Sequence, residues 1–197
     1  MPVGVPKVPF RVPGDDDASW VTLLNRLYRD RVLFLTEEID SENSNQLVSL
    51  IVYLTLEDKG KDLFVLINSP GGGVIYGMAI YDIMQVVPQN VHTICFGIAA
   101  SMACLILTGG TISKRTAFPH ARVMMHQPAS SFFEGYASDV FMETGELKKI
   151  RDSIKEIYTE RTYRLPWDVE VDLDRDSFMP ATTALDYGII DQIGLGF

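Results

Sequence analysis

Residues 63–73 read LFVLINSPGGG, and this stretch decides the fold class. Residues 63–68 predict a strand buried on both faces of a sheet, because their apolar run is nearly continuous. Three glycines at 71–73 predict a tight turn, and a helix is expected to follow through Ile83 until Pro88 stops it. A strand that leads through a turn into a helix is typical of parallel sheets, in which helices connect the strands.

The same pattern continues on both sides of this unit. Three further strands are expected, at residues 32–35, 91–96 and 122–125. One helix should open at Asp40 or Ser41 and end at Gly60, and another should run from about Ser101 to Leu107. Strands and helices in alternation predict parallel pairing with right-handed crossovers, so the sequence predicts an α/β fold of parallel-strand βαβ units.

A long charged helix is expected at residues 139–164. Its apolar stripe comprises Leu147, Ile150, Ile154 and Ile157 or Tyr158. Just before it, residues 130–137 mix small residues with Phe132, Phe133 and Tyr136. In a monomer these aromatic side chains would form an exposed patch, so they favour an oligomer contact or a strand that pairs with another. An ordinary helix that covers the sheet edge is the alternative.

The opening segment cannot be a helix or a central strand. Residues 1–14 contain four prolines, and three aspartates follow at 15–17. We therefore expect residues 1–17 to form a mobile arm and residues 18–197 to form a single domain. Ser19 is expected to cap a short helix that continues to Tyr28.

Composition excludes several classes of protein. The formal net charge of −9, from 26 acidic and 17 basic residues, disfavours nucleic acids and anionic membrane surfaces as partners. The longest apolar stretch, 94–107, is interrupted by Gly97 and is too short to span a membrane. The opening segment resembles neither a secretion signal nor a transit peptide. Cys95 and Cys104 lie in apolar runs, so we expect buried free thiols in an intracellular protein.

Ser101 is the first candidate for chemistry. Small residues at 97, 99 and 100 should expose its hydroxyl where a buried strand turns into a helix, and the Met102 N–H at that helix end could stabilise an oxyanion. A simple helix cap is the alternative role for Ser101. The glycines at 71–73 could also present backbone N–H groups to an anion, although by themselves they favour a plain tight turn, and they lack nucleotide-binding spacing.

A nucleophilic serine needs a base, and the chain has three histidines. His92 lies early in a strand and His120 in a loop, whereas His126 ends the strand at 122–125, at the same sheet edge as Ser101. The histidine spacing matches no zinc motif. His126 is therefore the candidate base, with a structural, hydrogen-bonded histidine as the alternative.

Taken together, these segments resemble the proteolytic subunits of the Clp protease family. The matching stretches are residues 67–72, 80–85, 93–103, 125–128, 174–179 and 186–191. They follow the family's order along most of the chain. The opening residues 1–11 are similar to those of the plastid-encoded form.

The resemblance implies the crotonase-like ClpP fold with a protruding strand-helix handle at about residues 130–165. It also implies a catalytic triad of Ser101, His126 and Asp176, with Gly72 and Met102 supplying the N–H groups of an oxyanion hole. From the residues alone, Asp172 and Asp174 are equally open as the acid, because residues two apart in extended chain share a face.

The resemblance further implies a serine endopeptidase that hydrolyses unfolded proteins inside two stacked seven-membered rings. This chain or its paralogues would form the rings, residues 1–17 would line the axial entrance, and a AAA+ ATPase partner would use ATP and feed the substrate. The chain itself would bind no cofactor and no metal. The expected location is the chloroplast stroma, with a bacterial-type cytoplasm as second choice.

Two other functions remain open on the sequence. A crotonase-type acyl-CoA hydratase or isomerase would share the sheet and a two-amide oxyanion hole, but it would need no Ser–His pair. A structural ring subunit would retain the triad residues without using them.

Overall fold

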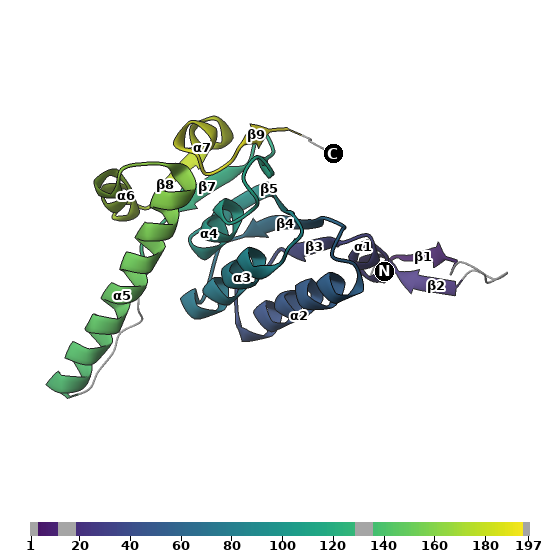
Figure 1. Ribbon diagram of the computed structural model, residues 1–197, viewed down its shortest axis with the longest axis horizontal. Coiled ribbons are helices and arrows are strands. Elements are labelled where there is room, and N and C mark those ends of the chain that lie inside the picture. Colours follow the sequence, from purple (N-terminus) through teal and green to yellow (C-terminus); the bar gives the residue numbers. More distant parts are fainter. Residues whose placement is uncertain (1–3, 12–18, 129–135, 195–197) are drawn as a thin grey trace.

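The computed structural model describes residues 4–11, 19–128 and 136–194 (Figure 1). It confirms the expected α/β class, with a mostly parallel sheet and helices packed against it. In the described residues this sheet has seven strands: β3 Val32–Leu35, β4 Leu63–Ser69, β5 Val91–Ala100, β6 Arg115–Ala117, β7 Arg122–Met125, β8 Ser177–Pro180 and β9 Gln192–Ile193. The described helices are α1 Leu23–Arg29, α2 Ser41–Glu57, α3 Val74–Val86, α4 Met102–Thr108, α5 Ala137–Thr162, α6 Pro166–Leu173 and α7 Ala181–Tyr187.

Strand β5 is the hub of the sheet. Strands β3, β4 and β5 pair in parallel, in that order. On its other edge, β5 pairs in parallel with β6 through Thr93–Cys95 and then with β7 through Ile98–Ala100. Strand β6 continues to β9 in parallel, whereas β7 pairs with β8 in the one antiparallel contact that the described sheet contains.

Gly97 lies where β5 changes partner. Its φ of 95° is in the left-handed region, and a Cβ at this position would lie 2.4 Å from Asn68 Oδ1. The same oxygen accepts a hydrogen bond from the Ile98 N–H at 3.1 Å. Glycine is therefore required here, because the side chain of Asn68 occupies the space beside it.

Asp40 caps helix α2, whose first residue is Ser41, so both expected starts have a place at the helix end. Its side chain accepts hydrogen bonds from the N–H groups of Glu42 and Asn43, both at 2.9 Å, while the Asn43 side chain accepts from the Asp40 N–H at 3.1 Å. The helix ends at Glu57, three residues before Gly60. Side chains at the start of the helix thus accept hydrogen bonds from three backbone N–H groups there.

Helices α2, α3 and α4 pack one on the next, and α4 is buried along its whole length. Cys95 of β5 and Cys104 of α4 lie in this core as free thiols, as expected. Burial raises the pKa of both thiols to about 12, so neither readily forms a thiolate near neutral pH. No helix in the described ranges is long and apolar enough to cross a membrane.

The beginning of the domain differs from the expectation that Ser19 caps a helix. Ser19 lies instead in β2 Ser19–Thr22, which pairs antiparallel with β1 Lys7–Phe10. Helix α1 follows, and its cap is Thr22, whose hydroxyl accepts from the Asn25 N–H at 3.4 Å. The aromatic and β-branched residues at 20–22 favour a strand, and pairing with β1 holds Ser19 away from the helix. Mobility of residues 1–17 stays a prediction.

Helix α5 has 26 residues and projects from the body of the molecule (Figure 1). The expected stripe is present: Ile154 and Tyr158 are 2% and 1% exposed. The first half of the helix is exposed, with Phe141 at 80%. Phe132 and Phe133, expected to form an oligomer contact, lie outside the described residues. A projecting helix agrees with the helical part of the expected handle.

Several short elements had not been predicted, and most of them lie in the last third of the chain. They are β1, β2, β6, α6, β8, α7 and β9. The longest of them, α6, has 8 residues, so none carries enough periodic positions to give a pattern in sequence.

Arg115 of β6 and Asp191 form a buried ion pair that closes the end of the chain onto the sheet. The Arg115 guanidinium donates to the two carboxylate oxygens at 2.9 and 2.6 Å, and the Arg115 N–H adds a bond at 3.0 Å. Burial opposes ionisation of Asp191, but the hydrogen bonds from Arg115 outweigh it and lower the pKa of Asp191 below 3.8. The ionised carboxylate therefore stabilises the folded state.

We predict that Asp191→Asn lowers the free energy of unfolding by about 3 kcal/mol, because it leaves the buried Arg115 guanidinium without a counter-charge. Since the folded-state pKa of Asp191 is lowered, this contribution is complete above about pH 5, begins to weaken below about pH 4 and is gone only when the pH has fallen below the lowered folded-state pKa. Urea unfolding at about pH 7 and about pH 3.5 measures the difference.

The matched control is Glu146→Gln, which breaks an exposed pair with Lys149. It should change the free energy of unfolding by about 0.5 kcal/mol at most. Equal stability of Asp191→Asn and the wild type at neutral pH would contradict the prediction.

Candidate active site

Ser101 lies in the sharp turn between β5 and α4. Its backbone angles are φ 54° and ψ −123°, a conformation that side-chain-bearing residues rarely adopt. The Ser101 N–H donates to the Met124 carbonyl at 2.9 Å, and the serine makes no side-chain hydrogen bond as a helix cap. The turn thus holds the serine by its backbone, and among the described residues its hydroxyl caps no N–H group, which weighs against the simple-cap interpretation. A strained strand-to-helix turn is also how α/β-hydrolases present their nucleophile.

His126 follows β7, the strand beside the end of β5. The parallel register pairs Ala100 with Met124, so Ser101 and His126 both leave the carboxyl ends of neighbouring strands. His126 is one-quarter exposed. The structure therefore places the expected nucleophile and the expected base at the same sheet edge.

Asp176 comes to this edge from the opposite direction. Strand β8 runs antiparallel to β7 with Met125 opposite Ser177, so His126, which follows Met125, faces Asp176, which precedes Ser177. Their side chains meet, with 2.5 Å between His126 Nδ1 and Asp176 Oδ1. The carboxylate is 70% exposed in the single chain.

The other two acids have other partners. Asp172 accepts a hydrogen bond from the Tyr187 hydroxyl at 2.9 Å, and Asp174 pairs with Arg151 at 2.8 Å. Of the three acids that the sequence left open, Asp176 is the one that contacts His126. Periodicity could not distinguish them, because the chain leaves helix α6 at Asp174 and does not run extended through all three.

The remaining histidines lie elsewhere. His92 Nε2 is 3.0 Å from Asp62 Oδ2, and its ring stacks on Phe64 with 4.5 Å between the ring centroids. His120 is exposed in the loop before β7. In the described residues neither histidine hydrogen-bonds to Ser101 or His126, and the partners of His92 agree with a structural role.

Gly71 packs directly against the serine turn, a contact that sequence reasoning missed. Its φ is 94°, and a Cβ here would lie 2.6 Å from the Ala100 carbonyl oxygen and 2.8 Å from Ser101 Cβ. Gly72, the expected oxyanion-hole donor, forms a parallel bridge with Ile39. The run of three glycines in the sequence could have indicated this contact, since close approach of two backbones requires residues without a side chain.

The two expected oxyanion-hole donors are open. Within the described residues, neither the Gly72 N–H nor the Met102 N–H donates a hydrogen bond. Met102 is the first residue of α4, so its N–H is one of those that a helix leaves unpaired. Two free N–H groups beside a serine are suited to stabilise negative charge on an oxygen bound to that serine.

Ser101 and His126 make no hydrogen bond to each other in the described structure. In enzymes without substrate this contact is often loose and tightens when substrate binds. Among the described residues, no three His, Cys, Asp or Glu side chains gather where they could hold a metal ion.

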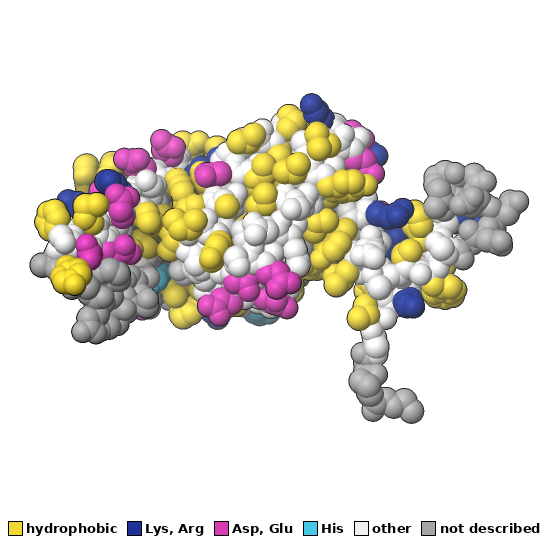
Figure 2. All heavy atoms as spheres, turned by 90° about the horizontal axis from the view of Figure 1, so that it is seen from below, with side chains coloured by type: hydrophobic (Ala, Val, Ile, Leu, Met, Phe, Trp, Pro, Cys, Tyr) yellow, Lys and Arg dark blue, Asp and Glu magenta, His cyan; other side chains and the backbone are white. Residues whose placement is uncertain are grey.

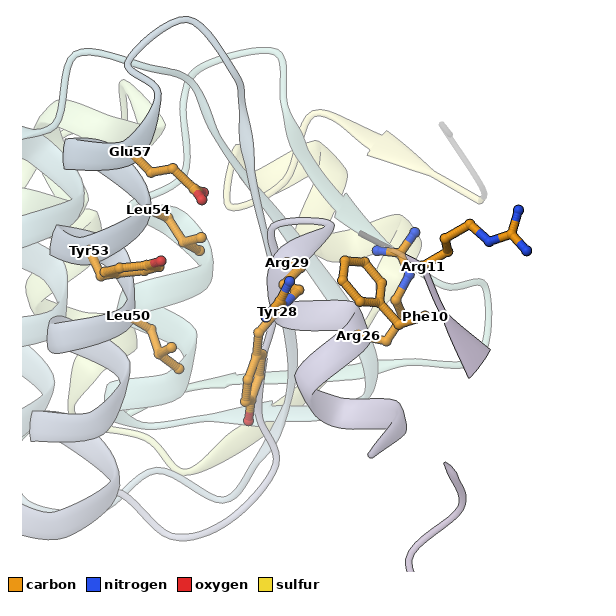
Figure 3. A pocket seen from close by; sticks show the side chains of 9 residues that line it. All are labelled: Phe10, Arg11, Arg26, Tyr28, Arg29, Leu50, Tyr53, Leu54 and Glu57. Atoms are coloured by element: carbon orange, nitrogen blue, oxygen red, sulfur yellow. The ribbon is translucent and has the colours of Figure 1, made fainter. Parts of the chain in front are cut away.

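A cavity of about 460 Å³ lies away from this site, between β1, α1 and α2 (Figure 3). Phe10 of β1 and the arginines of α1 lie on one side of it, and aromatic and aliphatic side chains of α2 line the other. Its lining residues are Phe10, Arg11, Arg26, Tyr28, Arg29, Leu50, Tyr53, Leu54 and Glu57. None of the expected catalytic residues takes part in it.

We predict that Gly71→Ala slows covalent labelling of Ser101 by a fluorophosphonate roughly tenfold or more, because displacing a reacting group by a fraction of an ångström is costly. Gly145→Ala is the control, since a Cβ at Gly145 meets nothing within 4 Å. Labelling rates are followed by intact-protein mass spectrometry. Equal rates for the two variants would show that the Gly71 contact does not shape the serine turn.

Comparison with known proteins identifies the family. The Clp protease family matches residues 15–195 of the chain. Proteins named ATP-dependent Clp protease proteolytic subunit from Vitis vinifera and Nicotiana tabacum are each 58% identical over 195 residues, which is 99% of this chain and 100% of theirs. The protein of the same name from Spinacia oleracea is also 58% identical over the same coverage. This chain therefore belongs to the Clp protease family.

Proposed function

We propose that this chain is the proteolytic subunit of an ATP-dependent Clp protease, a serine endopeptidase that hydrolyses peptide bonds of unfolded proteins. The observation that carries the proposal is the 2.5 Å contact between His126 Nδ1 and Asp176 Oδ1 at the sheet edge where Ser101 is presented. The relatives that match the whole chain carry the corresponding name.

In this mechanism the Ser101 oxygen attacks the scissile carbonyl carbon while His126 Nε2 takes the hydroxyl proton. Asp176 holds the ring by Nδ1 and stabilises the imidazolium that forms. The carbon–nitrogen bond then breaks, and His126 returns the proton to the leaving amine. Water, activated by the same histidine, hydrolyses the acyl-serine and regenerates the hydroxyl.

The oxyanion of each tetrahedral intermediate would accept hydrogen bonds from the N–H groups of Gly72 and Met102. Both groups are free in the described structure, and Met102 lies at the start of a buried helix. Donors fixed before the reaction stabilise the transition state without reorganising, and removal of one such donor costs about a hundred- to a thousand-fold in turnover elsewhere.

Assembly into rings accounts for the exposed apolar surface. Tyr53 and Leu56 of α2 are 61% and 75% exposed, and Ile75 of α3 is 65% exposed. Figure 2 shows hydrophobic side chains spread over the face seen from below. Surfaces of this kind are typical of subunit contacts. The proposed assembly is two stacked seven-membered rings of this chain, alone or with paralogues, that interlock through residues 130–165.

The energy for unfolding substrates would come from a AAA+ ATPase partner, which binds ATP in place of this chain. Residues 1–17 would line the axial entrance through which the partner delivers the substrate. The chain itself is proposed to use no cofactor. The proposed location is the chloroplast stroma, since the relatives come from plants and residues 1–11 are similar to the plastid-encoded form; a bacterial-type cytoplasm is the second choice.

A crotonase-type hydratase or isomerase is disfavoured by these observations. Such an enzyme would use the two N–H donors but would not need His126 beside Asp176. The full-length identity to protease subunits points the same way. Retention on a coenzyme A column without labelling of Ser101 would favour the hydratase instead.

We predict that Ser101→Ala lowers cleavage of a short fluorogenic peptide by about a million-fold, because a triad serine supplies the attacking oxygen. Rings that contain only variant copies should keep their size on gel filtration. Unchanged cleavage by these rings would rule out the assignment of Ser101. If only the paralogues in a mixed ring cleave the peptide, this chain is a structural subunit.

The triad acid has its own test. Asp176→Asn should lower turnover by about ten-thousand-fold, because the amide favours the wrong tautomer of His126. Asp172→Asn is the matched control four residues away, and it should cost far less, since Asp172 accepts a hydrogen bond from the Tyr187 hydroxyl. The measurement is peptide turnover by the two assembled variants. A larger loss in Asp172→Asn than in Asp176→Asn would contradict the assignment of Asp176.

A further inference from the structure

Within the described residues, Asp176 has little besides His126 to hold its side chain, since it is 70% exposed and makes one hydrogen bond. Its backbone is fixed on one side, where β8 begins at Ser177 and pairs with β7. On the other side, two residues away, Asp174 is the C-cap of helix α6. Whatever holds the end of α6 therefore sets where Asp176 lies.

Arg151 of α5 holds that end. Its Nη2 donates to Asp174 Oδ1 at 2.8 Å, and its Nη1 is 3.7 Å from Glu170, one turn earlier in α6. One turn further along α5, Lys155 is 3.5 Å from the same glutamate. A line of cations on α5 thus faces a line of carboxylates on α6, and Asp174 is the member nearest the triad.

The same helix end also contacts the segment that carries the base. The N–H of Gln127, the residue after His126, donates to the Leu173 carbonyl at 3.0 Å. The last turn of α6 is therefore bonded on one side to the segment that carries His126. On its other side it is bonded to Arg151. A shift of this turn would move Asp176 relative to the imidazole.

Arg151 is embedded between the helices and not freely solvated. Its side chain is 28% exposed, and its Nε is buried without a hydrogen-bond partner in the described chain. Burying an N–H in this way is unfavourable, so the two carboxylates are what stabilise the guanidinium here. A cation beside the C-terminal end of a helix also interacts favourably with the helix dipole.

We propose that Arg151 is a positioning residue for the triad: by binding Asp174, it holds the segment from Asp174 to Asp176 where the Asp176 carboxylate contacts His126. Arg151 touches none of the reacting groups and acts through Asp174. The inference rests on the proposed function, because it assigns Arg151 a role only if Ser101, His126 and Asp176 act together.

A double-mutant cycle tests the pair. Arg151→Gln, Asp174→Asn and the double variant are compared as assembled protein, by kcat and KM for a short fluorogenic peptide and by the rate of fluorophosphonate labelling of Ser101. Each single variant should lower kcat about fivefold with KM unchanged, which corresponds to a coupling of about 1 kcal/mol. The double variant should be no worse than either single one, since both remove the same contact.

Two further variants separate positioning from general stability. The charge swap Arg151→Asp with Asp174→Arg should restore kcat to within about twofold of the wild type, since it rebuilds the pair. Lys61→Gln is the control, because it breaks an exposed pair with Asp58 that lies outside α5 and α6; its kcat should not change. Unfolding midpoints and particle size are measured for every variant.

Wild-type kcat in Arg151→Gln would overturn the inference. So would losses that add in the double variant, or a fall in kcat that follows the unfolding midpoint and is not recovered by the charge swap. A wild-type protein whose Ser101 is not labelled at all would overturn the proposed function, and this inference with it.

Discussion

The hydrogen bond from the Ser101 N–H to the Met124 carbonyl joins the two strands whose ends carry the serine and the histidine. It extends the parallel pairing of β5 with β7 by one residue beyond Ala100. Because β7 also pairs with β8, the same strand sets the position of Asp176 opposite His126. Three segments far apart in sequence thus reach one sheet edge through backbone pairing alone, and a slip of one residue in either pairing would separate them.

The geometry at Ser101 is unfavourable in isolation, and the surrounding core is what maintains it. A serine with φ 54° and ψ −123° costs about 1–3 kcal/mol relative to relaxed backbone. Helix α4, buried along its whole length, begins at the next residue and cannot shift without disturbing the core. Gly71 closes the turn from the other side. Strain at the serine is therefore supported by apolar packing several residues away.

Sequence reasoning succeeded where an element is long or apolar enough to show its period. It placed β3, β4, β7, α2 and the stripe of α5, and the glycine turn and Ser101 marked the right sheet edge. It failed at Ser19, because four residues of strand pairing with β1 outweigh a cap signal. It could not choose among Asp172, Asp174 and Asp176, because that choice depends on where α6 ends and how β8 pairs with β7. Both are tertiary facts, and family resemblance supplied Asp176 in their place.

Helix α5 has 26 residues, and its side chains are buried in one half and exposed in the other. Ile154, Tyr158 and Thr162 are buried in its second half, whereas Phe141 and Met142 in its first half are 80% and 71% exposed. The exposed first half of α5 is about 13 residues long, and an isolated helix of about that length is marginal in water. In a separated subunit, amide hydrogens of the first three turns should therefore exchange with solvent almost as fast as in an unfolded peptide, while those near Tyr158 exchange only when the whole domain opens. The first half of α5 would become ordered only as subunits associate, so its protection from exchange reports assembly and not folding.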